Sequence, residues 1–411
     1  MSEGGFRLRA LPRNLWAVSA ASFFMDVSSE MVLTILPLFL ANVLGVRTAV
    51  IGLIEGVAES TASLLTLGSG WLSDRLRSRK WLAVAGYGLS ALSKPFFYVA
   101  GSWGLVAGVR WADRVGKGVR TAPRDALVAD SIRPEQRGLA FGLHRAADTG
   151  GAVAGLAVAL LLVWLGQAGS VALTRHTFRV VVLVSLVPAA VAVLALALLA
   201  RDVPVGGRRA APRVTLRGLG PRFGWFMLVV AVFTLGNSSD AFLVLRAQER
   251  GLSVAGVLGM LITFNIVYAL VSTPAGALSD RVGRRPVVIA GWLVYAAVYL
   301  GFAAAGAAWQ VWALFGVYGV YYGLAFGTMR AMVADLVPGA LRGTAFGTYN
   351  AVAGVLAAPA SVIAGVLWQG VLGWRGFGAS APFLFGGLMA LLASILMAAA
   401  LPEGGTDDGG A

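Results

Sequence analysis

The stretch GWLSDRLRSRK (residues 70–80) returns as GALSDRVGRRP (residues 276–286), 206 positions further along the chain. A second pair, VADSIRPEQRGLAFG (residues 128–142) and VADLVPGALRGTAFG (residues 333–347), lies 205 positions apart and is identical at 8 of 15 positions. A displacement of half the chain length that recurs at two places indicates two copies of one unit in the same order. The sequence therefore predicts two halves that are parallel repeats of each other.

Long apolar runs separate these motifs. The chain is 58% hydrophobic and 13% charged, whereas a soluble domain is about 25% charged. A run of about 20 apolar residues is long enough to cross a bilayer as a helix. We therefore expect an all-α membrane protein with two pseudo-symmetric bundles of six helices. The twelve predicted transmembrane helices lie at residues 15–44, 50–72, 81–101, 104–131, 140–165, 178–200, 223–246, 254–278, 286–306, 309–334, 344–371 and 381–401.

The formal charge of +14 is concentrated in alternate loops. Basic residues precede the first span, lie between the second and third spans, fill the centre of the chain and follow the eighth span. Positive loops stay on the cytoplasmic side, so we predict a multi-pass protein of the cell's inner (cytoplasmic) membrane with both termini in the cytoplasm. The basic excess then faces anionic inner-leaflet lipid, and no nucleic-acid partner is expected.

Composition also divides the chain into domains. Residues 201–222 mix arginines with Pro and Gly, which is typical of a flexible linker. We predict a six-helix bundle at 1–200, a cytoplasmic linker at 201–222, a second six-helix bundle at 223–402 and a disordered tail at 403–411. The chain has no cysteine, and it carries neither a nucleotide-binding loop nor a nucleophile–base cluster. No metal, cofactor or enzymatic activity is therefore expected.

The repeated loops carry a known signature. The run from Gly276 to Arg285 matches G-x3-D-R-x-G-R-R of the major facilitator superfamily, and the chain resembles that family over essentially its full length. The first copy differs, because Arg77 stands where glycine is usual. Arg110 lies twenty residues before Asp130, like the intramembrane arginine of the family's fourth helix. The run FFMDVSSEMVLTILPLFL is similar to one subgroup of bacterial and archaeal permeases, so the resemblance implies a transporter that works by alternating access.

By this resemblance, the loop motifs are conformational switches on the cytoplasmic face. Asp74 and Asp280 would cap the start of a neighbouring helix, and the arginines that follow would bridge to carboxylates. Breaking such contacts lets the halves separate at one face, which gives alternating access its two states. The residues assigned to these switches are Gly70, Asp74, Arg75, Asp130, Arg137, Gly276, Asp280, Arg281, Gly283, Arg284, Arg285, Asp335 and Arg342.

Charged residues inside the predicted spans lie mostly in the first half. A charge at bilayer depth costs several kcal/mol, so these side chains are expected to face the bundle interior. Two acidic pairs are spaced i,i+4, and the charges of the span at 104–131 fall within roughly a 140° arc. The candidate substrate and proton pathway comprises Asp26, Glu30, Glu55, Glu59, Lys94, Arg110, Asp113, Arg114, Lys117, Asp148, Asn237, Asp240 and Asn265.

A structural role is the alternative for some of these charges. Arg124, Asp125 and Arg145 lie near the predicted cytoplasmic edge, where they would reach the lipid headgroups. His144 is either a pH sensor or a hydrogen-bond donor to a neighbouring helix. Lys94 precedes a proline, whose kink would leave backbone carbonyls free near the cation.

Two carboxylates one turn apart in a cleft of low dielectric repel each other. Both this repulsion and desolvation favour the protonated acid. We hypothesise that Glu30 or Asp26 carries a coupled proton, with Arg110 as its switch partner. A buried ion pair often only breaks even against apolar packing, which favours a polar stripe along a water-filled path over a purely structural role.

The sequence thus predicts a monomeric transporter whose partners are a small-molecule substrate, membrane lipid and protons. Proton-coupled efflux of an amphipathic small molecule is the first interpretation, and uptake of an organic anion is the second. A lipid flippase on the same fold is a further alternative, and it would show a lateral opening with apolar walls. The transporter interpretations require Glu30 and Arg110 to face the interior of the protein.

Overall fold

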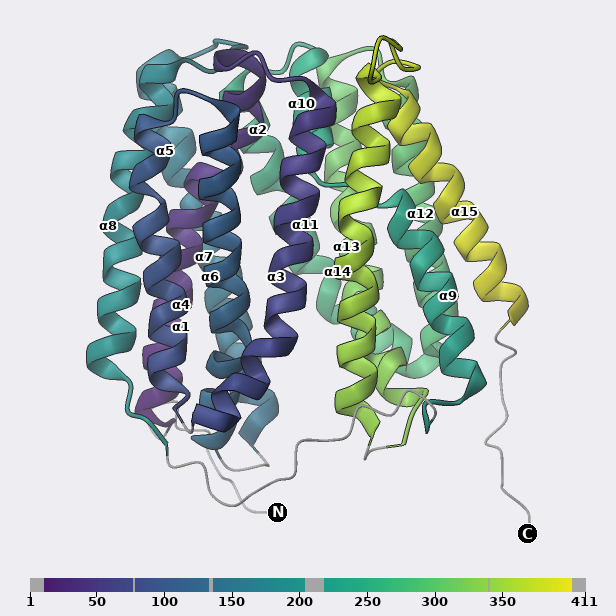
Figure 1. Cartoon of the computed structure of the whole chain (residues 1–411). Helices are drawn as coiled ribbons and strands as arrows, with labels where there is room; N and C mark the ends of the chain where they lie inside the picture. Colours follow the sequence, from purple (N-terminus) through teal and green to yellow (C-terminus); the bar gives the residue numbers. More distant parts are fainter. Residues whose placement is uncertain (1–10, 77, 133–135, 204–217, 339–340, 401–411) are drawn as a thin grey trace.

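The structure, a computed structural model of the chain, describes residues 11–76, 78–132, 136–203, 218–338 and 341–400. Regular structure in this part of the chain is entirely helical. The helices form two bundles that stand side by side, with the first half in purple to teal and the second half in green to yellow (Figure 1). The predicted all-α, two-bundle fold is confirmed. Most of the predicted linker and nearly all of the predicted tail lie outside the described residues.

The helices of the two halves follow each other without intervening strands in the described chain. The first half comprises α1 (Arg13–Leu33), α2 (Leu36–Leu38), the π-helical turn η2 (Phe39–Val43), α3 (Thr48–Leu76), α4 (Lys80–Ser93), α5 (Pro95–Val99), α6 (Trp103–Asp130), α7 (Arg137–Gln167) and α8 (Arg175–Leu199). The second half comprises α9 (Gly220–Gly236), α10 (Ala241–Glu249), α11 (Val254–Val282), α12 (Arg284–Ala304), α13 (Ala308–Asp335), α14 (Arg342–Gln369) and α15 (Ala381–Ala400).

Ten helical segments of the described chain are long and apolar enough to cross a membrane. The helical segments begin and end within four residues of the twelve predicted spans. Two of those spans fall short of the length and composition required, because α4 and α5 are separated at Lys94 and because α6 carries many charges. The chain is therefore a multi-pass membrane protein, while the count of twelve crossings stays a prediction.

Three predicted spans are interrupted where the local chemistry disfavours a helix. Proline lacks an N–H and clashes with the preceding turn; Pro37 follows the end of α1, and Pro95 begins α5. The third interruption is the stretch Asn237–Asp240 between α9 and α10. Asn, Ser and Asp side chains compete with the helix for backbone hydrogen bonds, so the span predicted at 223–246 is divided here into α9 and α10.

The start of α1 and the end of α15 lie at the same end of the bundle (Figure 1). We call this end the terminal end and the opposite end the far end. Hydrogen bonds join the two halves at the far end. The backbone N–H of Thr48 donates to the side-chain oxygen of Gln369 at 2.7 Å, and the Gln248 amide donates to the carbonyl of Val171 at 2.6 Å. These contacts hold the halves together on that side.

The helices α3 and α14 form a close seam between the halves. A Cβ at Gly56 would lie 2.7 Å from the Cα of Ala358, and a Cβ at Gly354 would collide with the side chain of Ser63. The hydroxyl of Ser60 donates to the carbonyl of Gly354 at 2.6 Å. Small residues let helix backbones approach this closely. The halves therefore pack tightly from the far end to about the middle of α3 and α14.

Candidate functional site

A cavity of about 460 Å³ lies between the two halves and is lined by residues of both. Its first-half wall comes from α1, α2, α3, α6 and α7, and its second-half wall from the α9–α10 connection, α10, α11, α13 and α14. We call it the central cavity. Glu30 and Arg110 face this cavity, as the transporter interpretation requires. The charged residues on its wall are Glu30, Glu55, Glu59, Asp240, Arg110 and Arg114.

Arg110 on α6 forms a two-pronged ion pair with Glu55 on α3. Its Nε donates to Oε1 at 3.2 Å and its Nη2 donates to Oε2 at 2.6 Å. The two side chains are only 4% and 6% exposed. The planar guanidinium fork matches the carboxylate and forms two parallel hydrogen bonds with it, while Nη1 of Arg110 has no hydrogen-bond partner among the described residues. The pair fixes α6 against α3 at the cavity wall.

Glu59, one turn beyond Glu55 on α3, is held more loosely. Its Oε1 lies 3.0 Å from Nη2 of Arg114 and 3.7 Å from Nη2 of Arg110. The Glu59 side chain is 41% exposed and lines the cavity. A cationic ligand in the cavity can therefore reach this carboxylate.

Glu30 and Asp26 are placed differently along α1. Glu30 lines the central cavity and accepts a hydrogen bond from Thr34 at 2.9 Å. Asp26 does not line it, and its electrostatic neighbours include Asp148 and Lys117. Arg110 pairs with an acid on α3 rather than with either of these residues, because its fork is directed across to that helix. Its role as their switch partner stays a hypothesis about another conformation.

Lys94 is fully buried where α4 gives way to α5. Its ammonium group donates to the hydroxyls of Ser28 at 2.5 Å and Ser29 at 3.1 Å, and it lies 3.5 Å from the sulfur of Met25. We expected carbonyls freed by the kink at Pro95 to surround this cation. It binds hydroxyl groups of α1 instead, so it ties the α4–α5 break to the helix that carries the two acids.

The other predicted charged residues of the first half do not all lie at the central cavity. Asp113 is buried beside Arg110, with its Oδ2 at 3.7 Å from Nη1. Lys117 is exposed and lines neither of the two cavities described here. Asp148 lies in the second cavity, which is described below. The charged residues of α6 therefore do not all face one cavity, although they lie along one side of the helix.

The α9–α10 connection supplies polar groups to the second-half wall. Asn237 and Asp240 line the cavity from this connection, and Asn265 lines it from α11. Asp240 accepts a hydrogen bond from the Tyr318 hydroxyl at 3.2 Å. The Asn265 amide donates to the carbonyl of Leu261, one turn earlier in its own helix, at 2.9 Å. These three predicted pathway residues are therefore brought to one wall, and Asp240 is its charged member.

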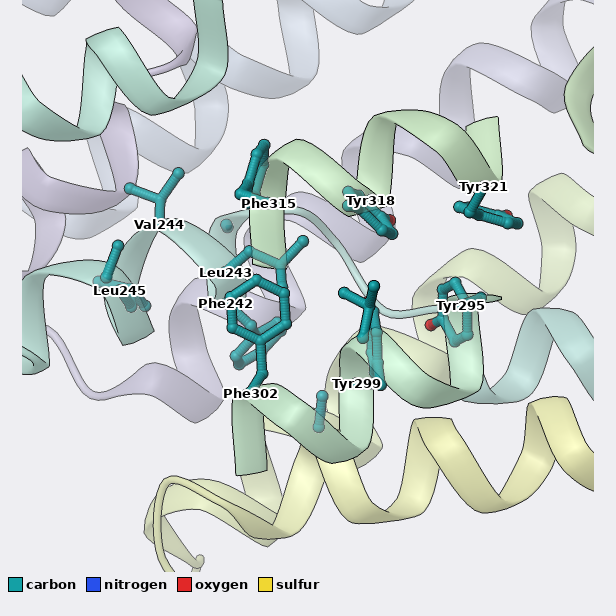
Figure 2. Close-up of a cluster of buried hydrophobic side chains, with 14 of the residues drawn as sticks. Phe242, Leu243, Val244, Leu245, Tyr295, Tyr299, Phe302, Phe315, Tyr318 and Tyr321 are labelled. Atoms are coloured by element: carbon teal, nitrogen blue, oxygen red, sulfur yellow. The ribbon is translucent and has the colours of Figure 1, made fainter. Parts of the chain in front are cut away.

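Stacked aromatic rings lie behind this wall. Tyr295 and Tyr299 stack with ring centroids 4.0 Å apart, and Tyr318 lies close to both (Figure 2). These rings are buried in the core of the second half, as packing tyrosines are expected to be. Tyr322 and Phe264, in contrast, reach the central cavity. The second-half wall is therefore aromatic with a single carboxylate, whereas the first-half wall is ionic.

A second cavity of about 360 Å³ lies nearer the terminal end, between α6 and α7 of the first half and α11 and α13 of the second. Arg124, Asp125 and Arg145 line this cavity together with His144 and Asp148. We expected the first three to reach lipid headgroups, and this expectation is wrong. The charged faces of α6 and α7 turn toward the other half, so these side chains border an interior space.

The second-half loop motif forms the expected arginine-to-carboxylate contacts, but not the expected cap. Gly283 adopts a φ of +92° between α11 and α12, in the left-handed region that favours glycine. Arg284 pairs with Asp280 and, at 3.2 Å, with Asp335. Arg285 donates to carbonyls in the last turn of α15. Asp280 thus contacts the side chain of the first residue of α12, and no side-chain hydrogen bond from the described residues caps the backbone of that helix.

The first-half motif repeats one network of the second half. In the first half, Arg79 contacts Asp130 at 2.5 Å and the Ser73 hydroxyl at 3.5 Å. In the same way, Arg284 of the second half contacts the corresponding residues, Asp335 and Ser279. The remaining switch residues make fewer contacts. Among the described side chains, no carboxylate pairs with Arg75 or Arg281, and Arg342 donates to the carbonyl of Ala334. Gly70 lies within α3 and Gly276 lines the second cavity. The side chains of Asp74 and Arg137 lie outside the described ones.

The acid that caps α4 comes from a residue that the sequence reasoning missed. Asp202 accepts hydrogen bonds from the Ser78 hydroxyl at 2.7 Å and from the backbone N–H groups of Arg79 and Lys80 at 3.1 Å. Burial raises the pKa of the Asp202 carboxyl, but these hydrogen bonds outweigh it and hold the pKa below its ordinary value. The signal was an aspartate directly after α8, at the end of the bundle where α4 starts.

An ion-lined cavity between two parallel helical halves defines a membrane transporter of the secondary class. The sequence profile of the Major Facilitator Superfamily matches residues 18–264 and 222–410, so the chain belongs to this family. It is therefore a secondary transporter and not an enzyme.

Comparisons with individual proteins agree with this assignment. The chain is 34% identical over 395 residues to an uncharacterised MFS-type transporter of Methanocaldococcus jannaschii, with 95% of each protein covered. Its fold resembles that of the nucleoside transporter NupG, with a TM-score of 0.77, 14% identity, and 95% of this chain and 100% of that chain covered. It also resembles a bacterial homologue of the human lysosomal transporter Spinster in its inward-facing and occupied conformation. The TM-score is 0.77 and the identity is 15%, with 94% of this chain and 96% of that chain covered. These two structures support the fold alone.

Proposed function

We propose that the protein exports an amphipathic small molecule that carries a positive charge, in exchange for protons. The observation that carries this proposal is the excess of acids on the wall of the central cavity, where four carboxylates face two arginines. Each arginine is already paired with a glutamate of α3. Glu30 and Asp240 accept hydrogen bonds from hydroxyl groups, which do not neutralise them. A cation or a proton supplies the missing positive charge.

The exchange follows from competition for the same carboxylates. A cationic ligand and a proton each neutralise an acid, so binding of one disfavours binding of the other. Glu30 lines the cavity and forms no ion pair among the described residues. An acid of this kind alternately binds substrate and proton as the cavity opens to each side of the membrane. The aromatic surface of Phe264 and Tyr322 supplies the apolar contact for the rest of the ligand.

The proposed direction rests on orientation. Arginine-rich loops occur at the terminal end, which we place in the cytoplasm. The halves are hydrogen-bonded at the far end, and the second cavity lies between them toward the terminal end. This arrangement suits loading of substrate from the cytoplasm. Opening of the α3–α14 seam would then release the substrate on the other side.

Purified full-length protein in proteoliposomes tests the proposal. Ethidium is a suitable probe because it is aromatic, amphipathic and cationic, and thermal-shift screening of metabolites and drugs would supply competitors. We expect an imposed pH gradient to drive ethidium transport, and Glu30→Gln to abolish the response to the gradient. Asn265→Leu, on the opposite wall, is the matched control. If the wild-type protein transports ethidium at the same rate with and without the pH gradient, proton movement is not coupled to transport.

Uptake of an organic anion is a second candidate, which Arg145 and Arg330 favour, because neither forms an ion pair with a carboxylate among the described residues. Protonation of acids on the cavity wall would reduce their repulsion of an anion, so proton and anion would bind together rather than compete. The two candidates predict opposite changes of ligand affinity with pH. Lowering the pH weakens binding of a cationic substrate and strengthens binding of an anionic one. Titration of the affinity for each library ligand between pH 5 and 8 therefore separates them.

A further inference from the structure

The second cavity carries charges that the proposed exchange mechanism does not use. It lies along the same helices as the central cavity, since Asp148 lines the second and Ala152, one turn later on α7, lines the first. One helical turn advances about 5.4 Å. The second cavity is thus a separate compartment next to the central one, on the side of the terminal end.

Two arginines in this cavity have no acidic partner. Arg145 on α7 and Arg330 on α13 lie over the ring of Phe326, at 5.4 Å and 4.6 Å from its centroid. Neither forms an ion pair with a carboxylate among the described residues. Arg124, in contrast, is neutralised by Asp125 at 2.9 Å. Two unneutralised guanidinium groups, one from each half, therefore converge on one aromatic ring.

Three described side chains at the same cavity have buried polar atoms without a hydrogen-bond partner, and they are His144, Thr328 and Asp148. His144 is 4% exposed, and neither of its ring nitrogens forms a hydrogen bond; Nε2 lies 3.8 Å from an oxygen of Asp148. Our alternative of a hydrogen bond from His144 to a neighbouring helix is therefore wrong. The hydroxyl of Thr328, 2% exposed, is also unpartnered. Buried polar groups are usually satisfied, so these groups point to a ligand that completes the site.

We propose that the second cavity binds an organic anion whose phosphate or carboxylate group lies between Arg145 and Arg330. A guanidinium fork binds planar or tetrahedral oxyanions through paired hydrogen bonds. The rings of Phe326 and Tyr268 line the cavity and provide an apolar surface for an aromatic body. His144 and Thr328 supply further hydrogen bonds. This proposal goes beyond the proposed exchange and does not depend on it.

Anion binding at this place has a consequence for the conformation. The arginines belong to different halves, and like charges that approach each other repel. Without an anion, this repulsion opposes any approach of α7 and α13 at the terminal end. An anion between the guanidinium groups replaces the repulsion by two attractions. The ligand therefore links α7 of the first half to α13 of the second half near the terminal end.

Calorimetric titration of purified full-length protein with phenyl phosphate tests the site. Wild-type protein should bind one equivalent in non-ionic detergent. Arg145→Gln and Arg330→Gln should each weaken binding by about tenfold, because each removes a charge-assisted pair of hydrogen bonds. Arg47→Gln, an equal loss of charge at the far end, should leave the affinity unchanged. Arg330→Lys keeps the charge without the fork and should retain part of the affinity, which separates loss of binding from loss of folding.

The anion could be soluble or the headgroup phosphate of a lipid, and nanodiscs distinguish these sources. If anionic phosphatidylglycerol competes with phenyl phosphate and zwitterionic phosphatidylcholine does not, lipid phosphate occupies the site. If neither lipid competes, the ligand is a soluble organic anion. The proposal is overturned if binding is not saturable by about 10 mM, or if the Arg145→Gln and Arg330→Gln variants bind as Arg47→Gln does. Failure of ethidium transport would leave this result unaffected.

Discussion

The two halves share one architecture, but corresponding helices carry opposite chemistry. At the repeat displacement of 205 residues, Arg110 and Asp113 on α6 correspond to Phe315 and Tyr318 on α13. In the first half these positions form an ionic network with α3. In the second half they form a cluster of packed rings (Figure 2). Charge and aromatic packing are thus divided between the two walls of one cavity, and each wall can be perturbed alone.

The same contrast explains why α1 is continuous where its counterpart is broken. Ser28 and Ser29 correspond to Ser238 and Ser239 of the α9–α10 connection. The hydroxyls of Ser28 and Ser29 accept hydrogen bonds from Lys94, which occupies them with a tertiary partner. In the second half, Ser239 instead accepts a hydrogen bond from the backbone of Ala241, two residues later. Such local bonds compete with the helix, so a distant lysine decides between the two conformations.

Glu55→Gln should have the largest effect of the single changes considered. It leaves the buried guanidinium of Arg110 without its two-pronged partner, and breaking one side of a buried pair costs about 3 kcal/mol. The free energy of unfolding in mixed detergent–SDS micelles measures this. Leu261→Met, at the corresponding position of α11, preserves volume and should cost less than about 1.5 kcal/mol. Equal effects of the two changes would contradict the ionic role of the first-half wall.

Gly354→Val should disturb the contact between the halves rather than either wall. The new side chain meets Ser63 at the seam, and overpacking of this kind costs about 1–3 kcal/mol. Spin labels at the far ends of α3 and α14 should show a longer separation than in the wild-type protein. Gly343→Val, on the same helix, is the control because a Cβ there meets nothing within 4 Å. An unchanged separation in Gly354→Val would mean that this seam does not hold the halves together.

Asp202→Ala sharpens the comparison of the two loop motifs, because it affects only the first. Loss of the cap on α4 should cost about 1 kcal/mol at pH 7, while Asp202→Asn, also a good cap, should cost less. The folded pKa of Asp202 is lowered. Its contribution is therefore present above the unfolded value of about 3.9 and is lost as the pH falls through the lower folded value. Thermal unfolding at neutral and acidic pH should show the difference from wild type disappearing in acid.

Tyr318→Phe should give the smallest change in stability. It removes one hydrogen bond to Asp240 and keeps the ring in its cluster, so about 1 kcal/mol or less is expected. The larger effect should be on ligand affinity, since Asp240 gains freedom to bind a cation. We expect tighter ethidium binding, measured by fluorescence titration. Weaker binding would show that the tyrosine hydroxyl positions this carboxylate for the ligand.

The sequence predicted the fold closely because hydropathy and the loop repeats are local signals. It also predicted that Glu30 and Arg110 would face the interior, since charges at bilayer depth avoid lipid. However, it placed Arg124, Asp125 and Arg145 at the headgroups. It did not predict that Arg110 pairs with Glu55, because pairing depends on the rotation and separation of α3 and α6. The cap from Asp202 and the second cavity were missed for the same reason. Each brings together groups that are more than a hundred residues apart.

The central claim is that the first-half acids couple protons to ligand binding. Its most direct test is the number of protons released when ethidium binds, measured by calorimetry of the purified protein in buffers of different ionisation enthalpy. The account predicts proton release in the wild-type protein and in Asn265→Leu, and a reduced release in Glu30→Gln. If ethidium binds without releasing protons, or if Glu30→Gln releases as many as the wild-type protein, the claim is contradicted.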